Sequence, residues 1–341
     1  MACAAGRNRT TRLPRRIAAA AAPLLPAALL AACDGRQSAF NAGGDEAAAL
    51  LEITWVLFIG AGVIFAAVMA LAAYAVVARP ENFFGARSWV IGAGVVFPVV
   101  TLTALQVYEY DVARRLRGPA GEDTLRIEVT GVMWWWDVRY PAMDGGEGFR
   151  TANELVIPVG RPVELVVTAA DVIHSFWVPS LSGKVDMIPG HVNRLRFVVE
   201  EAGVYRGQCA EYCGAQHAWM AFDVVAVPPE RFAAWLEGQR RPAAEPADPV
   251  LAAGRDAFLR SGCGECHVVR GTPADGMRGP DLTHVGGRRS LAAGVLPNGV
   301  GALAGWIAGA QHIKPGNRMP SFGNLDGPAL RAMAAWLESL E

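Results

Sequence analysis

The sequence predicts three parts of different fold class: a hairpin of two transmembrane helices, an all-β barrel or sandwich, and an all-α domain. Two long apolar runs near residues 50 and 90 predict the hairpin, and short β-type runs from residue 124 predict the second part. Helical patterns after residue 249 predict the third. The length of 341 residues allows two or three domains. The hydrophobic fraction of 52% with 18% charged residues indicates membrane segments.

The N-terminus has the pattern of an export signal. Several arginines precede a run rich in alanine and leucine, which ends in Leu-Ala-Ala-Cys at Cys33. A charged region, an apolar region and small residues before a cleavage site are typical of a signal peptide, so residues 1–32 are excluded from the fold. The final four residues resemble a bacterial lipobox, which predicts a lipoprotein cleaved before Cys33. Ordinary cleavage near Ala32, with Cys33 left free, is the alternative.

Residues 50–78 and 88–108 are each long enough to cross a hydrocarbon core about 30 Å thick. We expect them to form a hairpin in the lipid bilayer. Arg79 and Arg87 place the short loop between them on the cytoplasmic side, because basic residues favour that side. Everything after the second span then lies outside the cytoplasm, which agrees with the export signal.

Residues 120–228 are predicted to form the all-β domain. Glycine, proline and asparagine separate its strand-like runs, as is typical of a sandwich or barrel. These runs are LRIEVTGV, ELVIPV, VELVVTA, LRFVVE, VYRGQC and FDVVAV.

A loop rich in soft metal ligands, CAEYCGAQHAWM, lies near the end of this domain. It carries Cys209, Cys213, His217 and Met220, and a further histidine, His174, lies upstream in DVIHSFWVP. Thiolate, imidazole and thioether suit copper better than magnesium or calcium. One cysteine with these partners would give a mononuclear blue-copper site. Two thiolates on one tight loop can bridge two copper ions, with one histidine on each.

In the binuclear interpretation Met220 is a weak ligand to one copper, and the carbonyl of Glu211 is placed for the other. Ligands on loops of a β domain predict a cupredoxin-like Greek-key barrel. Two alternatives remain for the loop. One is a disulfide between Cys209 and Cys213 in an oxidising compartment. The other is structural zinc, which usually needs a second Cys or His pair at short spacing.

Residues 50–230 resemble subunit II of cytochrome c oxidase, through VTGVMWWWDVRY, DVIHSFWVPSLSGKVDMIPGHVN and the loop itself. The resemblance implies a binuclear copper centre, CuA. The implied ligands are His174, Cys209, the Glu211 carbonyl, Cys213, His217 and Met220. It also implies that the Glu211 side chain can reach a magnesium ion at the boundary with subunit I.

Three consecutive tryptophans, Trp134, Trp135 and Trp136, lie within this resemblance. Alternate residues of a strand face the same side, so we expect Trp134 and Trp136 to point together and Trp135 away. The resemblance implies that Trp134 is the surface aromatic through which electrons enter from cytochrome c. Core packing or anchoring at a membrane interface is the ordinary alternative.

Residues 229–249 are predicted to be a linker. A short helical segment opens at Pro228 and Pro229, and RRPAAEPADP follows, with the proline content and mixed charge of a semi-extended spacer. Acidic residues outnumber basic ones before this linker, and basic residues slightly outnumber acidic ones after it. This asymmetry favours docking of the two flanking domains.

Residues 250–341 are predicted to form an all-α cytochrome c domain. Cys263-Gly-Glu-Cys266-His267 is the CxxCH pattern of c-type haem attachment, in which the cysteines hold the haem covalently and His267 binds iron. A helical run before it, export from the cytoplasm and RGPDL just after it support this interpretation. A structural CxxC with an accidental histidine is the alternative.

The second axial ligand is expected about 50 residues beyond His267. Met319, in KPGNRMPSF, fits and resembles the Met-Pro of class I cytochromes c. Met277 lies near the attachment site in a predicted loop. His284 and His312 would instead give a bis-histidine haem of lower potential.

The resemblance implies subunit II of a terminal cytochrome c oxidase with a fused cytochrome c domain, as in caa-type haem-copper oxidases. We expect it to act as the electron-entry subunit of the enzyme. Electrons would pass from haem c to CuA and on to the haem-copper subunit I, which reduces dioxygen to water. One alternative is the electron-input subunit of a nitric-oxide-reducing haem-copper enzyme. The other is a non-catalytic periplasmic copper and haem carrier.

The expected partners are oxidase subunits I and III, the lipid bilayer, and a periplasmic or membrane electron donor. Cytochrome c and a quinol–cytochrome c reductase are examples of such a donor. No nucleic-acid partner is expected. The expected location is the bacterial inner membrane, with both metal-binding domains on the periplasmic face.

Overall fold

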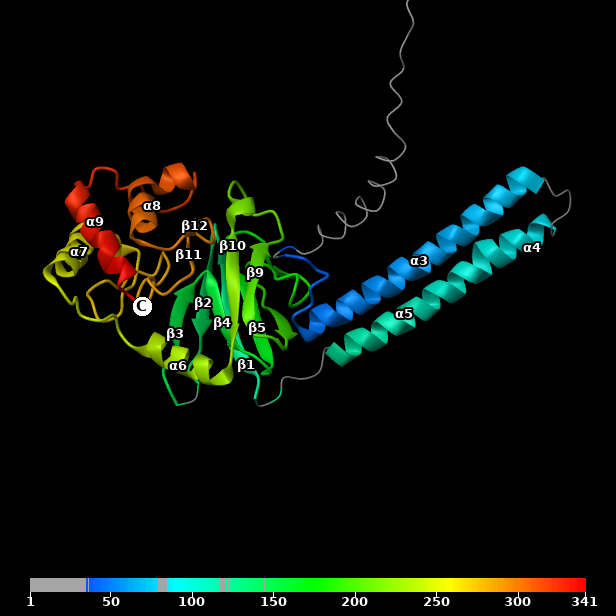
Figure 1. The fold of residues 1–341 in the computed structure, drawn as a ribbon, viewed down its shortest axis with the longest axis horizontal. Helices are drawn as coiled ribbons and strands as arrows, with labels where there is room; N and C mark the ends of the chain where they lie inside the picture. The colour runs from blue at the N-terminus through cyan, green and yellow to red at the C-terminus, as the bar shows by residue number, and fades with distance from the viewer. Residues whose placement is uncertain (1–34, 36, 79–84, 117–120, 122, 144) are drawn as a thin grey trace, which may run out of the picture.

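The computed structural model describes residues 35, 37–78, 85–116, 121, 123–143 and 145–341. The predicted signal peptide and Cys33 lie outside the described residues. Two long helices, a β domain (residues 123–227) and a helical domain (residues 249–341) follow one another along the long axis of the molecule (Figure 1). This confirms the predicted order of fold classes.

Two apolar helices form the N-terminal hairpin. Their parts are α3 (Asp45–Ala78), α4 (Ala86–Ile91), the π-turn η1 (Gly92–Val96) and α5 (Phe97–Leu116). Both helices are long and apolar enough to cross a membrane, and their most apolar stretches are not buried by the rest of the chain. The π-turn ends two residues before Pro98, whose missing N–H interrupts regular α-helical hydrogen bonding.

Hydrogen bonds attach the first turn of α3 to the β domain. The Asp45 N–H donates to the Val198 carbonyl at 3.1 Å, and the Val198 N–H donates to the Asp45 carboxylate at 2.8 Å. The Ala47 N–H donates to the Leu181 carbonyl at 3.3 Å. The hairpin is therefore held to the β domain by contacts as well as by the chain.

The β domain consists of two five-stranded sheets. The first has the order β3-β2-β1-β5-β8 and the second β4-β10-β9-β6-β7. Their bounds are β1 (Leu125–Val132), β2 (Trp135–Tyr140), β3 (Phe149–Ala152), β4 (Glu154–Pro158), β5 (Val163–Ala169), β6 (His174–Trp177), β7 (Val185–Met187), β8 (Asn193–Phe197), β9 (Gly203–Cys209) and β10 (Ala221–Val227). The pairs β1·β5 and β4·β10 are parallel and the others antiparallel, so the chain crosses between the sheets repeatedly.

The core of the β domain lies between the sheets. Strand β1 alternates buried and more exposed side chains, as a half-buried strand does. Trp136, Phe176 and Phe222 are fully buried and meet at ring-centroid distances of 4.6 to 6.0 Å. Trp134 lies in the turn before β2, so strand alternation does not relate it to Trp136 as we expected. The direction of the Trp134 side chain is instead set by the contacts that it makes, which are described below.

One carboxylate inside the first sheet is surrounded by arginines. Glu164, on β5, is 1% exposed and forms ion pairs with Arg126 at 2.9 Å, Arg194 at 2.8 Å and Arg196 at 2.6 Å. Arg126 and Arg196 are its direct neighbours on β1 and β8. Burial alone would raise the pKa of Glu164, but the guanidinium groups lower it below the ordinary value.

The helical domain follows α6 (Pro229–Arg240), which covers the β domain with Phe232 and Leu236. Its elements are α7 (Pro249–Arg260), the short turn η3 (Cys263–Glu265), β11 (Ser290–Leu291), β12 (Leu296–Pro297), α8 (Val300–Ile313) and α9 (Gly327–Glu338). Asp248 and Asp326 cap α7 and α9 by accepting backbone N–H groups. The first part of the predicted linker is thus helical and packed.

Helices α7 and α9 cross at close range. A Cβ on Gly254 would lie 2.1 Å from the Ala332 carbonyl oxygen, so this crossing requires glycine. Beside it, Phe258 and Trp336 make an edge-to-face contact with centroids 5.2 Å apart. The crossing places the end of α7 directly before the CxxCH turn.

Glu164→Gln is expected to destabilise the β domain at neutral pH by on the order of 3 kcal/mol, because three guanidinium groups lose their buried charge partner. The lowered pKa means that this stabilisation is present above the ordinary carboxylate pKa and is lost as pH falls through the folded pKa. The difference in unfolding free energy between the variant and the wild type should therefore decrease at acidic pH. Chemical unfolding at several pH values measures it. Glu128→Gln, which removes an exposed pair with Arg139, is the control and should cost under about 1 kcal/mol.

Candidate metal centres

Strand pairing builds the loop that holds the soft donors. β9 ends at Cys209 and β10 begins at Ala221, and the Cys209 N–H donates to the Met220 carbonyl at 2.9 Å, which closes the loop. β6 begins at His174 and pairs antiparallel with β9. The remote histidine and the loop are therefore brought together by a β ladder.

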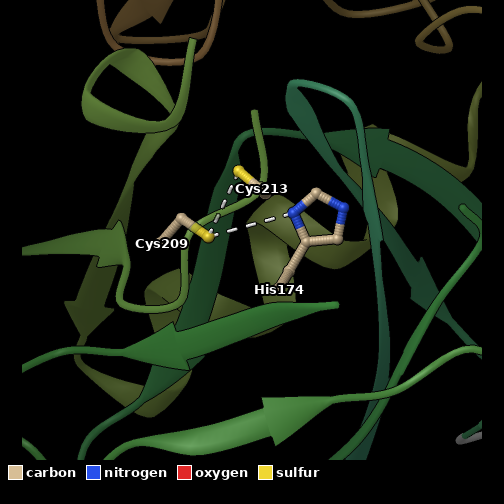
Figure 2. Close-up of side chains that lie close together, drawn as sticks. All are labelled: His174, Cys209 and Cys213. Atoms are coloured by element: carbon tan, nitrogen blue, oxygen red, sulfur yellow. Dashed lines mark hydrogen bonds between the residues drawn. The ribbon is translucent and has the colours of Figure 1, made fainter. Parts of the chain in front are cut away.

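The side chains of the two cysteines and this histidine point toward one another (Figure 2), and both cysteines belong to the buried core of the β domain. The sulfurs of Cys209 and Cys213 lie 3.7 Å apart, far beyond an S–S bond of about 2.05 Å. His174 Nδ1 lies 3.9 Å from the Cys209 sulfur. All three residues are buried, and their donor atoms lie within 4.8 Å of one another. The two cysteines therefore do not form a disulfide, and the positions of their sulfurs allow both to bind a shared metal.

The other predicted donors extend this group. His217 Nδ1 lies 3.6 Å and Met220 Sδ 3.8 Å from the Cys213 sulfur. The Glu211 carbonyl oxygen lies 3.2 Å from the Cys209 sulfur. One histidine therefore contacts each thiol, and each thiol has one further weak donor. The six predicted donors form a continuous group.

The thiol pair cannot easily carry two negative charges without a cation. The contact between the two sulfurs lowers the pKa of the Cys209 thiol to about 3. The same contact raises the pKa of Cys213, because a second thiolate would face the first at 3.7 Å in a buried site. Metal ions deprotonate coordinating thiols outright. The donor set and its charge fit soft, cationic copper.

Asp171 orients His174 toward the thiols. Its carboxylate accepts a hydrogen bond from His174 Nε2 at 3.0 Å, which leaves Nδ1 directed at Cys209. The carboxylate also accepts the Met133 and Val172 N–H groups, each at 2.9 Å. Burial alone would raise the pKa of Asp171, but these hydrogen bonds lower it, so the carboxylate stays charged. The sequence indicated no such role for Asp171.

The Glu211 side chain does not join the thiol site. Its carboxylate is 44% exposed and lies 3.8 Å from the Lys184 ammonium. The backbone carbonyl and the carboxylate of Glu211 therefore face different surroundings. A residue that takes part in a copper site and a separate magnesium site would need this arrangement.

The CxxCH residues line a second candidate site, a cavity of about 870 Å³. His267 Nδ1 donates to the Pro280 carbonyl at 2.8 Å, which leaves Nε2 free to bind a metal. Burial lowers the pKa of His267, which favours the neutral, ligating form. Apolar side chains cover much of the wall, namely Phe258, Leu303, Trp306, Ile307, Phe322, Met333 and Leu337. The size, apolar wall and attachment residues fit a c-type haem.

The candidate axial ligands differ in their exposure and in their contacts. Met319 and Met277 both line the cavity. Met277 is 59% exposed, and its sulfur accepts a hydrogen bond from Arg150 of the β domain at 3.0 Å. Met319 is half-buried and packs against the core of the helical domain. His284 has both ring nitrogens occupied, by the carbonyls of Glu341 and Arg241, which favours Met319.

Comparison with known proteins gives the type of each domain. The model for the periplasmic domain of cytochrome c oxidase subunit II matches residues 145–227, and the cytochrome c model matches residues 251–341. Together they cover a little over half of the chain. The chain therefore contains a periplasmic domain of the cytochrome c oxidase subunit II type, followed by a cytochrome c domain. A subunit II domain implies copper and a cytochrome c domain implies haem, in agreement with the two donor sets.

Curated relatives share this assignment. Cytochrome c oxidase subunit 2 of Alkalihalophilus pseudofirmus is 38% identical over 221 residues, which is 65% of this chain and 63% of that protein. The subunit 2 of Bacillus sp. strain PS3 is 33% identical over 232 residues, 64% of this chain and 63% of that protein. The chain thus matches less than two thirds of these relatives' length. The periplasmic domain of subunit II (CoxB) from Bradyrhizobium japonicum is 36% identical, covers 36% of this chain and 95% of that one, and has a TM-score of 0.33.

Trp134 lies between the two candidate sites. Its indole N–H donates to the Cys213 carbonyl at 2.9 Å, and its ring packs close to Gly214. The same residue lines the cavity that holds His267. One side chain therefore contacts the copper loop and borders the haem cavity.

Charged pairs also join the β and helical domains. Arg318 forms an ion pair with Asp171 at 3.3 Å. Arg289 lies 4.0 Å from Asp223, and its N–H donates to Glu154 at 3.1 Å. Basic residues of the helical domain thus meet acidic residues of the β domain, as the charge asymmetry predicted.

Asp171→Asn is expected to weaken copper binding about 10- to 100-fold, because a residue that orients a ligating histidine sets its tautomer and direction. Competition with a copper chelator measures the affinity. Asp186→Asn is the matched control, since Asp186 lies on β7 beside β6 without a described hydrogen bond to a donor. Equal affinities for Asp171→Asn and wild type would contradict the assignment.

Met319→Ala is expected to lower the haem reduction potential and remove the spectral signature of methionine ligation, while the covalent haem remains. Met277→Ala, a change of the same kind on the same cavity, should leave both unchanged. A redox titration followed optically distinguishes them. If only Met277→Ala lowered the haem reduction potential, Met277 and not Met319 would be the axial ligand.

Proposed function

We propose that this chain is the electron-entry subunit of a terminal cytochrome c oxidase. It would accept electrons at a haem c held by Cys263, Cys266 and His267, pass them to a binuclear CuA centre and deliver them to a haem-copper subunit I. That subunit would reduce dioxygen to water. The observation that carries the proposal is the continuous group of six donors, two thiols, two imidazoles, a thioether and a carbonyl, beside the haem cavity, with Trp134 between them.

The proposed copper ligands are the six residues of this group. Cys209 and Cys213 would bridge the two ions, with His174 and His217 each on one of them. Met220 and the Glu211 carbonyl would complete the pair. Each assignment is supported by a contact of 3.9 Å or less to a thiol. The Glu211 carboxylate, directed elsewhere, is proposed for a magnesium ion at the boundary with subunit I.

The proposed haem ligands are His267 and Met319. The Pro280 carbonyl fixes the ring of His267, and burial keeps it neutral. Methionine ligation raises haem potential, which suits a centre placed before CuA. When bound, the haem and copper supply reversible one-electron chemistry. The chain contributes a rigid, largely buried setting, which keeps structural change on electron transfer small.

Trp134 is proposed as the point where electrons cross between the sites. Its hydrogen bond to the Cys213 carbonyl and its position on the wall of the haem cavity support this role. An external donor, such as a cytochrome c or a quinol–cytochrome c reductase, would then reduce the haem rather than the copper.

The proposed setting is the bacterial inner membrane. Helices α3 and α5 would form the anchor, and the β and helical domains would lie on the periplasmic face. Subunits I and III are the proposed partners. Co-purification of the chain with a large polytopic haem subunit would support the assembly. Recovery of the chain alone would favour an independent electron carrier.

Cys209→Ser is expected to abolish the binuclear copper spectrum and leave the haem band, because it removes one of two bridging sulfurs. The wild-type chain should contain two copper ions and one covalent haem. Metal analysis with an optical spectrum measures both. Cys263→Ser is the reciprocal control and should affect haem attachment only. One zinc, one copper or a disulfide at the loop in the wild type would overturn the proposal.

A further inference from the structure

A buried lysine lies between the β domain and the helical domain. Lysine occurs only twice in the sequence, and Lys314, at the end of α8, is 2% exposed. Its ammonium donates to the carbonyls of Trp134 at 2.8 Å, Trp219 at 2.8 Å and Ala292 at 2.9 Å. An ammonium has three N–H donors, so all of them are used. No carboxylate among the described residues forms an ion pair with it.

The three carbonyls come from three separate segments. Trp134 lies in the turn before β2 and Trp219 in the copper loop, next to Met220, whereas Ala292 belongs to the helical domain. One charged group thus joins both domains at the copper loop. A compact ammonium can meet three converging carbonyls, whereas the planar fork of arginine cannot.

The turn 292–294, between β11 and β12, directs three consecutive carbonyls into the same interface. Ala292 faces Lys314, Ala293 accepts the Ala221 N–H at 3.0 Å, and Gly294 accepts from Arg206 at 3.1 Å. Ala292 and Ala293 have φ values of 54° and 61°, a left-handed conformation that is unfavourable for alanine. Such a conformation persists where surrounding contacts over-determine it, and these contacts cross the interface.

We propose that Lys314 and the turn 292–294 form a latch between the two domains, and that Lys314 is the residue that positions the helical domain on the copper loop for electron transfer. This inference rests on the proposed function. Trp134 is held from both sides, since its indole donates to Cys213 and its carbonyl accepts from Lys314.

The latch acts on geometry rather than on either cofactor. Lys314 donates to the Trp219 carbonyl, which directly adjoins Met220. Its hydrogen bonds among the described residues all end on backbone carbonyls and none on a proposed copper donor. Without the ammonium, three carbonyls from three segments would lose their shared donor at a buried position, and water could enter the interface. Electron transfer slows steeply as two centres separate, so small movements of the helical domain would matter.

The test uses the full chain loaded with copper and haem in detergent, and the variant Lys314→Met. The Ala221 amide reports docking, because it donates across the interface to Ala293. The Val156 amide, which donates to the Tyr140 hydroxyl inside the β domain, is the internal reference. Hydrogen exchange at both amides is measured by mass spectrometry. The rate of haem-to-copper electron transfer is measured after photoreduction.

Lys314→Met is expected to accelerate exchange at Ala221 by about tenfold or more, which corresponds to the loss of one charged hydrogen bond. Exchange at Val156 and both metal spectra should stay unchanged, and electron transfer should slow. Arg289→Met is the matched control. It removes the same charge from the rim of the interface, where the side chain is 53% exposed, and should change neither rate.

Unchanged exchange at Ala221 in Lys314→Met would overturn the latch. Faster exchange with unchanged electron transfer would overturn the positioning role. If Lys314→Met lost its fold or its haem, Lys314→Gln, which keeps a neutral donor, would decide by the same measurement at Ala221. Wild-type chain without paired copper would refute the proposed function, while exchange at Ala221 would still test the latch.

Discussion

The pairing of β6 with β9 is the constraint on which the copper loop, and through this loop the domain interface, depends. It brings His174 to Cys209, across 35 residues of sequence, and fixes where the loop to Met220 begins. Two thiols are thereby buried 3.7 Å apart, an arrangement that disfavours a second negative charge without a cation. Positive charge close to the two sulfurs would therefore stabilise both thiolates, and bound copper would supply that charge.

The outer face of the same loop forms part of the docking surface for the helical domain. Trp134 and Lys314 both contact this loop, through the Cys213 and Trp219 carbonyls, and Lys314 also donates to the Trp134 carbonyl. Two ion pairs also join the domains, and their arginines are more than half exposed, so water screens each pair and its individual contribution is small. The ammonium of Lys314 is different, because this residue is 2% exposed and its hydrogen bonds are made to backbone carbonyls of both domains. Docking specificity therefore resides at the centre of the interface rather than at its charged rim.

Local patterns accounted for much of the molecule. The apolar lengths predicted the membrane helices, and the β-type runs became β1, β4, β5, β8, β9 and β10. The donor types and spacing between Cys209 and Met220 predicted a copper loop, and CxxCH predicted a haem domain. These signals are visible in the sequence because each depends on residues close together in the chain. The short strands β2, β3, β6 and β7 gave weaker patterns.

The sequence by itself determined which chemistry each domain can hold, because soft donors and haem attachment residues are encoded in short motifs. Tertiary structure alone decided how the sites are oriented and joined. Asp171 acts on His174 only through the turn between β5 and β6, and Trp134 leaves the strand pattern because a turn precedes β2. Lys314 finds its carbonyls in three segments far apart in the chain. Backbone carbonyls carry no sequence signature, so such contacts emerge only once the chain is folded.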